Sequence, residues 1–204
     1  MKRSGARLRV IGGTLRGRRL IAPSGRSIRP TSDRVREALF DILGRRVSGA
    51  FFLDACAGTG AVGIEALSRG ARFVAWIEKD GRALELLERN IQVAGGVAGG
   101  KRILALDIPE AVAALEREGF QFDLIYLDPP YGGGQSDRAL RLVGASRLLK
   151  PDTLVIVEHE ASEAPAAVSS HGRLRPERTV TYGRAALTFF STGRTAAAGD
   201  DSVD

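Results

Sequence analysis

The sequence holds a single cysteine, Cys56, and only two histidines, His159 and His171. One cysteine excludes an internal disulfide and a zinc site built from several cysteines. Two histidines give little support to a histidine-based triad or metal centre, so we predict no metal site. No apolar run approaches the roughly 20 residues that cross a bilayer. The charged first ten residues lead into no apolar segment of a secretory signal, so we expect a cytoplasmic protein without a membrane partner.

Positive charge is abundant, and it is concentrated near the N-terminus. The net charge is +6, but residues 1–50 hold 13 Lys/Arg against 3 Asp/Glu, whereas the rest of the chain holds 17 against 21. Such asymmetry indicates a polyanionic partner, with a solubilising tail as the alternative. Apolar pairs inside this basic region, Val10-Ile11 and Leu20-Ile21, indicate that it folds.

Short apolar runs alternate with helical patterns from about residue 51 onward. Strands are predicted at 51–55, 72–77, 102–106, 122–127 and 153–157. Helices are predicted at 61–68, 82–93, 109–118 and 136–149. Near-continuous apolar strands separated by helices predict an α/β fold with a parallel sheet covered on both faces. Residues 178–182 and 185–190 flank a Gly183-Arg184 turn and predict a closing antiparallel hairpin.

The N-terminal region has a different pattern. Residues 7–21 predict a hairpin of two short strands. Thr31 or Ser32 is expected to cap a helix that runs to Leu43 and ends at Gly44. We therefore divide the 204 residues into a basic extension, a main domain and a disordered tail, which cover residues 1–45, 46–191 and 192–204.

A glycine-rich loop, Gly58-Thr59-Gly60, follows the first predicted strand. Glycine lets the backbone approach a ligand closely. With Gly63, the loop reads Gly-x-Gly-x-x-Gly, yet it is preceded by an acid, Asp54, whose carboxylate would repel a pyrophosphate. That carboxylate suits an ammonium group, directly or through water. No Gly-Lys-Ser/Thr follows, so the loop is not a phosphate P-loop either.

Two further acids are expected at neighbouring strand ends, Glu78 after the second strand and Asp107 after the third. A carboxylate at the position of Glu78 accepts hydrogen bonds from ribose hydroxyls, and Asp107 is placed to accept from an adenine amino group. Ordinary polar caps are the alternative. Because ligands of such sheets bind beyond the carboxyl ends of the strands, the three acids predict a site for a nucleoside cofactor.

The predicted strand 122–127 ends in Asp128-Pro129-Pro130-Tyr131. The amino nitrogen of a nucleobase is a poor nucleophile because its lone pair is delocalised into the ring. The Asp128 carboxylate and the Pro129 carbonyl can accept its two N–H groups and turn the lone pair toward an electrophile, which is catalysis by positioning and electrostatics. Pro130 stiffens the loop, Tyr131 offers a stacking face, and Asp128 or water takes the surplus proton. A plain turn after the strand is the alternative.

Five segments together carry a family resemblance: Arg9–Gly13, Arg16–Leu20, Arg29–Phe40, Asp54–Gly70 and Asp128–Tyr131. Through them the chain resembles the class I S-adenosylmethionine-dependent methyltransferases. More narrowly, it resembles the bacterial 16S ribosomal RNA (guanine-N2)-methyltransferase family over about residues 7–191. The segment Arg29–Phe40 is the most specific, because generic methyltransferases lack it.

The resemblance implies a Rossmann-like, mostly parallel seven-stranded sheet with a terminal antiparallel hairpin. It implies S-adenosylmethionine as the cofactor, S-adenosylhomocysteine as the product, and one guanine N2 of small-subunit rRNA as the target. The substrate is expected within a partly assembled small subunit, and a monomer is favoured. The implied target-amine residues are Asp128, Pro129, Pro130 and Tyr131. The implied cofactor-binding residues are Asp54, Cys56, Gly58, Thr59, Gly60, Glu78, Lys79, Asp107 and Ile108.

Arginines of the N-terminal extension are candidates for contacts with RNA phosphates. The candidates are Arg16, Arg18, Arg19, Arg29, Arg34 and Arg36. For Arg34 and Arg36, ion pairs within the protein are an equally good interpretation.

Three rival functions follow from the same residues. Cys56 suggests a cytosine-C5 methyltransferase, but that chemistry places its cysteine on the loop that here holds Asp128. An adenine-N6 or cytosine-N4 DNA methyltransferase uses the same tetrapeptide, although no separate target-recognition domain is evident. A non-catalytic RNA-binding or ribosome-assembly protein is the third, and the intact set of Asp54, Glu78 and Asp128 argues against it.

Overall fold

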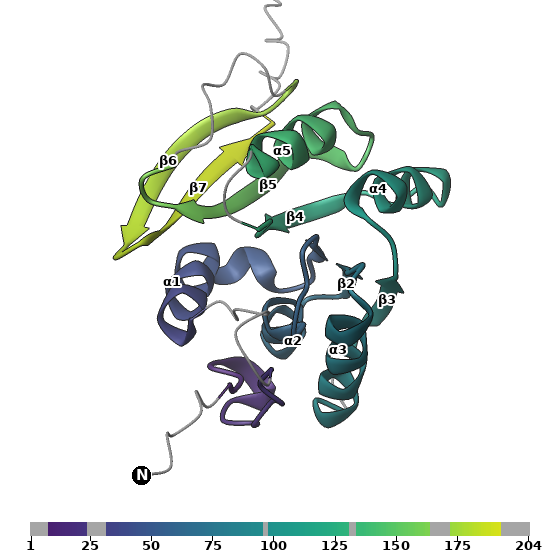
Figure 1. The fold of residues 1–204 in the computed structure, drawn as a ribbon, viewed down its shortest axis with the longest axis vertical. Helices are drawn as coiled ribbons and strands as arrows, with labels where there is room; N and C mark the ends of the chain where they lie inside the picture. The colour runs from purple at the N-terminus through teal and green to yellow at the C-terminus, as the bar shows by residue number, and fades with distance from the viewer. Residues whose placement is uncertain (1–7, 24–31, 96–97, 131–133, 164–171, 193–204) are drawn as a thin grey trace, which may run out of the picture.

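The computed structural model describes residues 8–23, 32–95, 98–130, 134–163 and 172–192. They form a seven-stranded sheet in the order β3-β2-β1-β4-β5-β7-β6 (Figure 1). The strands are β1 (Phe51–Asp54), β2 (Phe73–Ile77), β3 (Gly100–Leu104), β4 (Phe122–Leu127), β5 (Leu149–Glu160), β6 (Arg175–Tyr182) and β7 (Ala185–Ser191). Neighbouring strands from β3 to β5 are parallel, whereas β7 is antiparallel to both β5 and β6. The predicted fold is confirmed.

Helices cover both faces of the sheet (Figure 1). One face carries α1 (Asp33–Leu43), α2 (Ala61–Ser68) and α3 (Gly81–Val93), and the other carries α4 (Ile108–Arg117) and α5 (Gln135–Ala145). Alternate residues of a strand point to opposite faces, so Phe52 and Leu53 belong to different buried clusters. None of the helices that the structure describes is long and apolar enough to span a bilayer.

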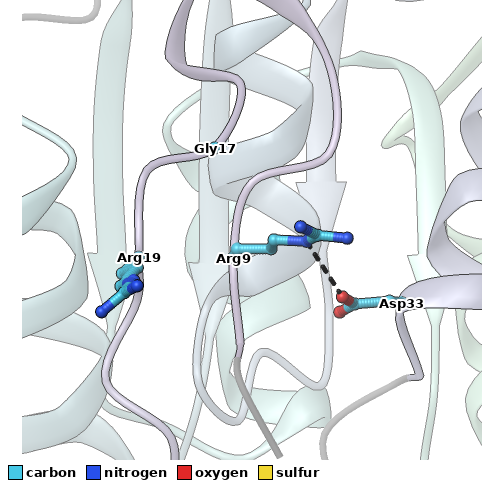
Figure 2. Close-up of a pocket in the computed structure, with 4 residues that line it drawn as sticks. All are labelled: Arg9, Gly17, Arg19 and Asp33. Carbon is cyan, nitrogen blue, oxygen red and sulfur yellow. Dashed lines mark ion pairs between the residues drawn. The ribbon is translucent and has the colours of Figure 1, made fainter.

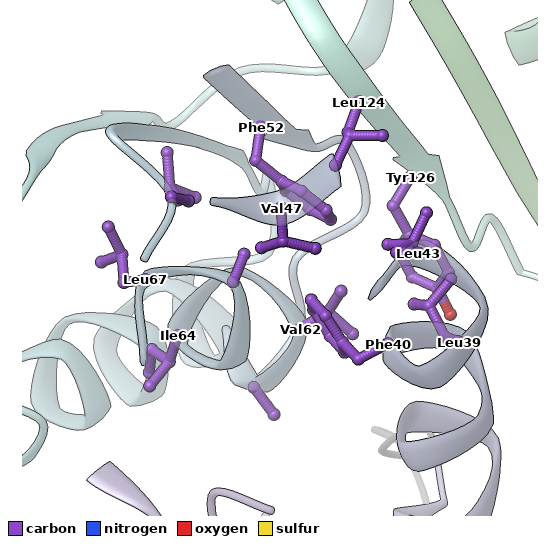
Figure 3. Close-up of a cluster of buried hydrophobic side chains, with 14 of the residues drawn as sticks. Leu39, Phe40, Leu43, Val47, Phe52, Val62, Ile64, Leu67, Leu124 and Tyr126 are labelled. Atoms are coloured by element: carbon purple, nitrogen blue, oxygen red, sulfur yellow. The ribbon is translucent and has the colours of Figure 1, made fainter. Parts of the chain in front are cut away.

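Helix α1 packs one apolar side against the sheet. The hydroxyl of Ser32 accepts a hydrogen bond from the Val35 N–H (3.2 Å), so the predicted N-cap is confirmed at Ser32, while Thr31 lies outside the described residues. Leu39, Phe40 and Leu43 are buried in the cluster that contains Phe52 and Tyr126 (Figure 3). Each such side chain contributes about 1.5–3 kcal/mol by leaving water, so α1 is part of the core rather than an appendage.

Residues 8–21, the N-terminal hairpin, form two antiparallel segments beside α2 (Figure 1). Val10 N–H donates to Arg18 O and Leu20 N–H to Leu8 O, both at 2.9 Å. The predicted hairpin is therefore present, but as a single bridge with a 3-10 turn, η1 (Gly13–Leu15), in place of full strands. A Cβ on Gly13 would lie 1.9 Å from the carbonyl oxygen of Ser68, so only glycine permits this approach to α2.

Several predicted boundaries are wrong. Strand β5 spans Leu149–Glu160 rather than 153–157, and β6 begins at Arg175 rather than 178. Strand pairing explains two further differences. Helix α5 ends at Ala145 rather than 149, because the Phe122 N–H donates to Leu148 O and Leu149 pairs with Phe122. Strand β3 spans Gly100–Leu104 rather than 102–106, in register with the whole of β2. A short 3-10 turn, η2 (Gly44–Val47), follows α1. The predicted tail beyond Thr192 lies outside the described residues.

Candidate active site

The two loops predicted to carry the chemistry begin at adjacent points of the sheet. Asp54, the last residue of β1, lies opposite Trp76 of β2 and Tyr126 of β4. Just beyond it, the Ala55 N–H donates to Tyr126 O at 2.9 Å, two residues before Asp128. The glycine-rich loop and the Asp128 loop therefore begin side by side, at the carboxyl ends of β1 and β4.

Asp54 is almost completely buried, with 1% of its surface exposed. Its Oδ2 accepts a hydrogen bond from the Gly63 N–H (3.0 Å) and so anchors the first turn of α2. Burial raises the pKa of Asp54 to about 7, and the negative charge of Glu78 adds to the rise, while the Gly63 hydrogen bond opposes it. A cation beside this carboxylate would offset the cost of ionising it, which fits the ammonium group inferred from the sequence.

Three different structural features favour glycine at these positions of the loop. Gly58 (φ +52°) and Gly60 (φ +76°) adopt left-handed backbone that favours glycine. A Cβ on Gly60 would lie 2.2 Å from a methyl of Leu87, so the loop is pressed against α3. A Cβ on Gly63 would lie 2.2 Å from Nε1 of Trp76. The third glycine of the motif thus serves close packing of α2 on β2.

Glu78 follows β2 and ties the glycine-rich loop to the start of α3. Its Oε2 accepts from the Gly58 N–H and its Oε1 from the Asp80 N–H, both at 2.8 Å. Each carboxylate oxygen has two lone-pair sites, so ribose hydroxyls can bind beside these amides. Lys79, next to it, is exposed, and the Thr59 side chain is buried in the loop.

Asp107 does not end β3, as the sequence suggested, but lies three residues beyond it. It is the N-cap of α4, where its Oδ1 accepts from the Glu110 N–H (3.1 Å). One of its two carboxylate oxygens therefore acts as a helix cap, as the alternative interpretation of the sequence predicted. Ile108, the first residue of α4, is half-buried next to it.

Cys56 lies where the two loops meet. The main chain of Asp128 forms a hydrogen bond with its thiol. Burial, followed by the charge of Asp128 and smaller contributions from Asp54 and Glu78, raises the pKa of the Cys56 thiol far above its ordinary value. A thiol that stays protonated is a poor nucleophile, so the cytosine-C5 interpretation is disfavoured. The charges of three acids, Asp128, Asp54 and Glu78, therefore all act on this one side chain.

The Asp128 loop is only partly covered by protein. Asp128 is half-buried, Pro129 is buried and Pro130 is exposed, while Tyr131 lies outside the described residues. A half-exposed carboxylate beside a buried glycine-rich loop can meet both a small cofactor and a larger substrate from solvent.

The arginines predicted to contact RNA fall into distinct groups. Arg16, Arg18, Arg19 and Arg34 are exposed, whereas Arg29 lies outside the described residues. Arg36 is fully buried.

The contacts of Arg36 explain its burial and correct its predicted role. Its guanidinium donates to Arg9 O (2.6 Å) and to Asp33 Oδ1 (2.9 Å), and its Nε lies 3.9 Å from Glu65 Oε2. Because the whole side chain serves pairing inside the protein, the structural alternative holds for Arg36, and we no longer count it among the RNA contacts.

A hollow of about 380 Å³ lies away from the predicted cofactor residues, between the N-terminal hairpin and the start of α1. Arg9, Gly17, Arg19 and Asp33 line it (Figure 2). Arg9 reaches toward Asp33, with Nε 3.6 Å from Oδ2. Both side chains are largely exposed, so this pair contributes little to stability. The hollow belongs to the basic extension.

The buried polar residues Glu65 and Ser68 of α2 and Asn90 of α3 were not identified from the sequence. Glu65 of α2 accepts from the Ile11 and Gly12 N–H groups, both at 2.7 Å, and pairs with Arg69 at 2.8 Å. Asn90 of α3 bonds both the N-terminal hairpin and the glycine-rich loop. All three stand among buried positions of their helices. A polar residue within a predicted apolar face is the signal that could have found them.

The model of the family described as Conserved hypothetical protein 95 matches residues 8–191. The chain belongs to this family. The match includes both the N-terminal hairpin and the two loops of the site.

Three relatives show how far the similarity extends. The Ribosomal RNA small subunit methyltransferase D of Escherichia coli K12 is 34% identical over 171 residues, which are 84% of this chain and 84% of that protein. The protein of the same name from Haemophilus influenzae is 31% identical over 172 residues, or 84% of this chain and 88% of that one. The solved structure of the Escherichia coli protein yhhF has a TM-score of 0.74 at 32% identity and covers 91% of this chain and 97% of that one. The family resemblance found in the sequence is confirmed.

Proposed function

We propose that this protein transfers a methyl group from S-adenosylmethionine to the exocyclic N2 amino group of a guanine in small-subunit ribosomal RNA. One observation carries the proposal: Asp128 lies at the end of β4, in contact with Cys56 of the glycine-rich loop that Asp54 opens. An acceptor for an amino group thus stands beside a loop suited to a nucleoside cofactor.

The described residues fit this cofactor. The buried carboxylate of Asp54, whose pKa is raised to about 7, would be stabilised in its ionised form by the cofactor's ammonium group. Glu78 would hold the ribose hydroxyls beside the amides it already binds, and Asp107 would meet the adenine amino group with Ile108 against the ring. The cofactor would lie close to the backbone of Gly58, Thr59 and Gly60. Cys56 and Lys79 would lie at the edges of the cofactor site.

When bound, the cofactor supplies an electrophilic methyl group and leaves as S-adenosylhomocysteine. The chain's own residues orient the acceptor. The Asp128 carboxylate and the Pro129 carbonyl take the two N–H groups of the base, so that the nitrogen lone pair faces the methyl carbon. Pro130 limits the loop's freedom, Tyr131 stacks on the base, and Asp128 or water removes the proton released as the N–C bond forms.

Exposed arginines supply the electrostatic contact with RNA. Arg16, Arg18 and Arg19 lie on the N-terminal hairpin and Arg34 on α1, with Arg29 between them in sequence. A base must leave its stack to enter such a site, at a cost of a few kcal/mol. Contacts with phosphates on either side of the target would offset that cost.

Two lines support ribosomal RNA as the substrate. Relatives that share about a third of their residues with this chain are named for methylation of the small ribosomal subunit. The basic N-terminal region is matched by the family model together with the site. We further propose that a monomer acts in the cytoplasm on a partly assembled subunit, with the target atom argued from the Asp128 loop and the family resemblance.

To test the proposal, the protein is incubated with isotopically labelled S-adenosylmethionine and one of three acceptors. The acceptors are 30S particles from cells lacking this gene, naked 16S rRNA, and duplex DNA. We expect N2-methylguanosine at a single position of the rRNA, identified by nucleoside mass spectrometry. Label on adenine N6 or cytosine N4 of DNA would replace the proposal with its nearest rival. No label on any acceptor, despite binding of RNA, would indicate a non-catalytic protein.

A further inference from the structure

Asn90 occupies an unusual place for an amide side chain. It is completely buried on α3, on the face that also carries Ala83, Leu86 and Leu87. A buried amide without partners costs about 1–3 kcal/mol, so its hydrogen bonds decide what it does.

Three hydrogen bonds satisfy the amide, and they lead to two different parts of the molecule. Its Oδ1 accepts from the Ile21 N–H (2.7 Å), and its Nδ2 donates to Ile21 O (3.1 Å). The same Nδ2 donates to Thr59 O (2.9 Å). Asn90 thus pairs with Ile21 as a neighbouring strand would, and also holds the carbonyl that precedes Gly60.

Two side chains of α2 anchor the N-terminal hairpin at a different place. Glu65 and Ser68 of α2 bond the main chain of Ile11, Gly12 and Leu15. Those bonds fix the tip of the hairpin to the helix, whereas Asn90 fixes its return segment to the glycine-rich loop.

We infer that Asn90 is a positioning residue that couples cofactor binding to RNA binding. This inference rests on the proposed function. A cofactor that orders the backbone around Thr59 also fixes the Asn90 amide, and Ile21 then meets a fixed partner, which orders the basic hairpin before RNA arrives. Coupling of this kind is reciprocal: the cofactor strengthens RNA binding by the same factor by which RNA strengthens cofactor binding.

The test measures the ratio of two affinities in the full chain. Binding of 30S particles from cells lacking this gene is measured with and without saturating S-adenosylhomocysteine, which cannot be consumed. For the unchanged protein we expect at least about fivefold tighter binding with S-adenosylhomocysteine, the lower end of typical coupling. In Asn90→Ala and Asn90→Asp the ratio should fall toward one. An aspartate keeps the size and the acceptor for the Ile21 N–H but cannot donate to Thr59 O or to Ile21 O.

Ser68→Ala is the matched control. It removes hydrogen bonds from the hairpin to α2 without touching Thr59, so RNA affinity should weaken while the ratio stays at its original value. A ratio that is unchanged in the Asn90 variants, or that falls equally in Ser68→Ala, would overturn the inference, because Asn90 would then be one more structural anchor.

Hydrogen–deuterium exchange in the unchanged protein tests the same link without a substitution, and it decides the question if the Asn90 variants fail to fold. S-adenosylhomocysteine should slow exchange of the Ile21 amide by fivefold or more, and an unaltered rate would reject the coupling. The proposed function fails separately, if the protein neither binds S-adenosylhomocysteine nor methylates 30S particles. If the protein methylates 30S particles but binds them equally well with and without S-adenosylhomocysteine, the coupling is wrong and the proposed function stands.

Discussion

Glu78, which follows β2, lies near enough to Asp54, at the end of the adjacent parallel strand β1, for its charge to act on that carboxylate. Burial is the main cause that raises the pKa of Asp54 to about 7, and the charge of Glu78 adds to it. Two neighbouring acids destabilise each other when both are ionised. Such an arrangement is costly in the free protein, and a bound cation at Asp54 would relieve it.

Asp54 should make the free protein less stable as the pH rises toward neutrality. Its pKa is about 7 in the folded chain against an ordinary value of 3.8, so between these values the folded state holds a proton that the unfolded state has released. The free energy of unfolding contributed by this group therefore falls as pH increases through this window and is constant above it. Asp54→Asn cannot titrate, so urea unfolding from pH 5 to 8 should show the variant gaining stability relative to the original protein. If the free energies of unfolding of the two proteins change in parallel with pH, the raised pKa of Asp54 is wrong.

The fold was largely predictable because burial on both faces leaves a strong mark on a strand. The runs at Phe51–Asp54 and Phe122–Leu127 are almost wholly apolar, and each is followed by a helical pattern. The boundaries at Leu149 and Gly100 were not predictable from periodicity. Both depend on pairing with a strand distant in sequence, which overrides the local pattern.

The site was predictable where topology alone places residues. Asp54 ends β1, and Glu78 and Asp128 directly follow the neighbouring strands β2 and β4, so the order of the strands in the sheet brings the three acids together. Arg36 and Asn90 show the opposite case. Whether a polar residue on a helix faces solvent or the interior depends on what packs against that helix, and the partners, Arg9 and Ile21, lie far away in sequence.

Glu65→Gln should destabilise the protein strongly. The substitution removes the charge that faces Arg36 and Arg69 and replaces one acceptor of the Ile11 and Gly12 N–H groups by a donor. Removing one partner of a buried ion pair typically costs about 3–5 kcal/mol, measured here by urea unfolding at constant pH.

Glu85→Gln provides the control for this prediction. Glu85 is exposed on α3, so the same chemical change there should alter the free energy of unfolding by less than about 0.5 kcal/mol. Equal effects of the two substitutions would show that Glu65 does not act through its buried contacts.

Gly63→Ala should destabilise the junction of α2 and β2. The added methyl would lie 2.2 Å from Nε1 and 2.6 Å from Cε2 of Trp76, whose ring is fully buried and cannot move away freely. Overpacking of this kind costs about 1–3 kcal/mol.

Gly81→Ala is the matched control, because nothing lies within 4 Å of a Cβ at that position. It is the first residue of α3, where alanine restricts the unfolded chain more than glycine does. A gain of about 0.4–1 kcal/mol is expected there. Thermal unfolding of both variants distinguishes the steric effect from a general effect of replacing glycine in a helix, and a stable Gly63→Ala would disprove the close packing.

Charge reversal of Arg16, Arg18 and Arg19 should weaken binding to 30S particles and flatten its dependence on salt. All three side chains are exposed on the N-terminal hairpin. Each lost phosphate contact reduces the slope of log affinity against log salt by about 0.7–0.9. Filter binding between 50 and 300 mM salt measures both quantities.

The same change of net charge on the opposite side of the sheet controls for bulk electrostatics. Arg117 on α4, Arg141 on α5 and Arg147 beyond α5 are also exposed. Their reversal should leave the salt slope close to that of the original protein. If both triple variants lose the same slope, the N-terminal hairpin has no special part in RNA binding.

Asp128→Ala should abolish methyl transfer while leaving the cofactor site in place. The carboxylate is proposed to hold the amino group and to accept its proton, and losing such a group typically lowers kcat by about 10²–10⁴-fold. Asp54 and Glu78 keep their own hydrogen bonds to Gly63 and Gly58, so the affinity for S-adenosylhomocysteine should change only a few-fold. Single-turnover transfer to 30S particles measures the first quantity and calorimetry the second. A variant with full activity would rule out the orientation of the amine by Asp128, whereas parallel loss of cofactor binding would assign this residue to the cofactor site.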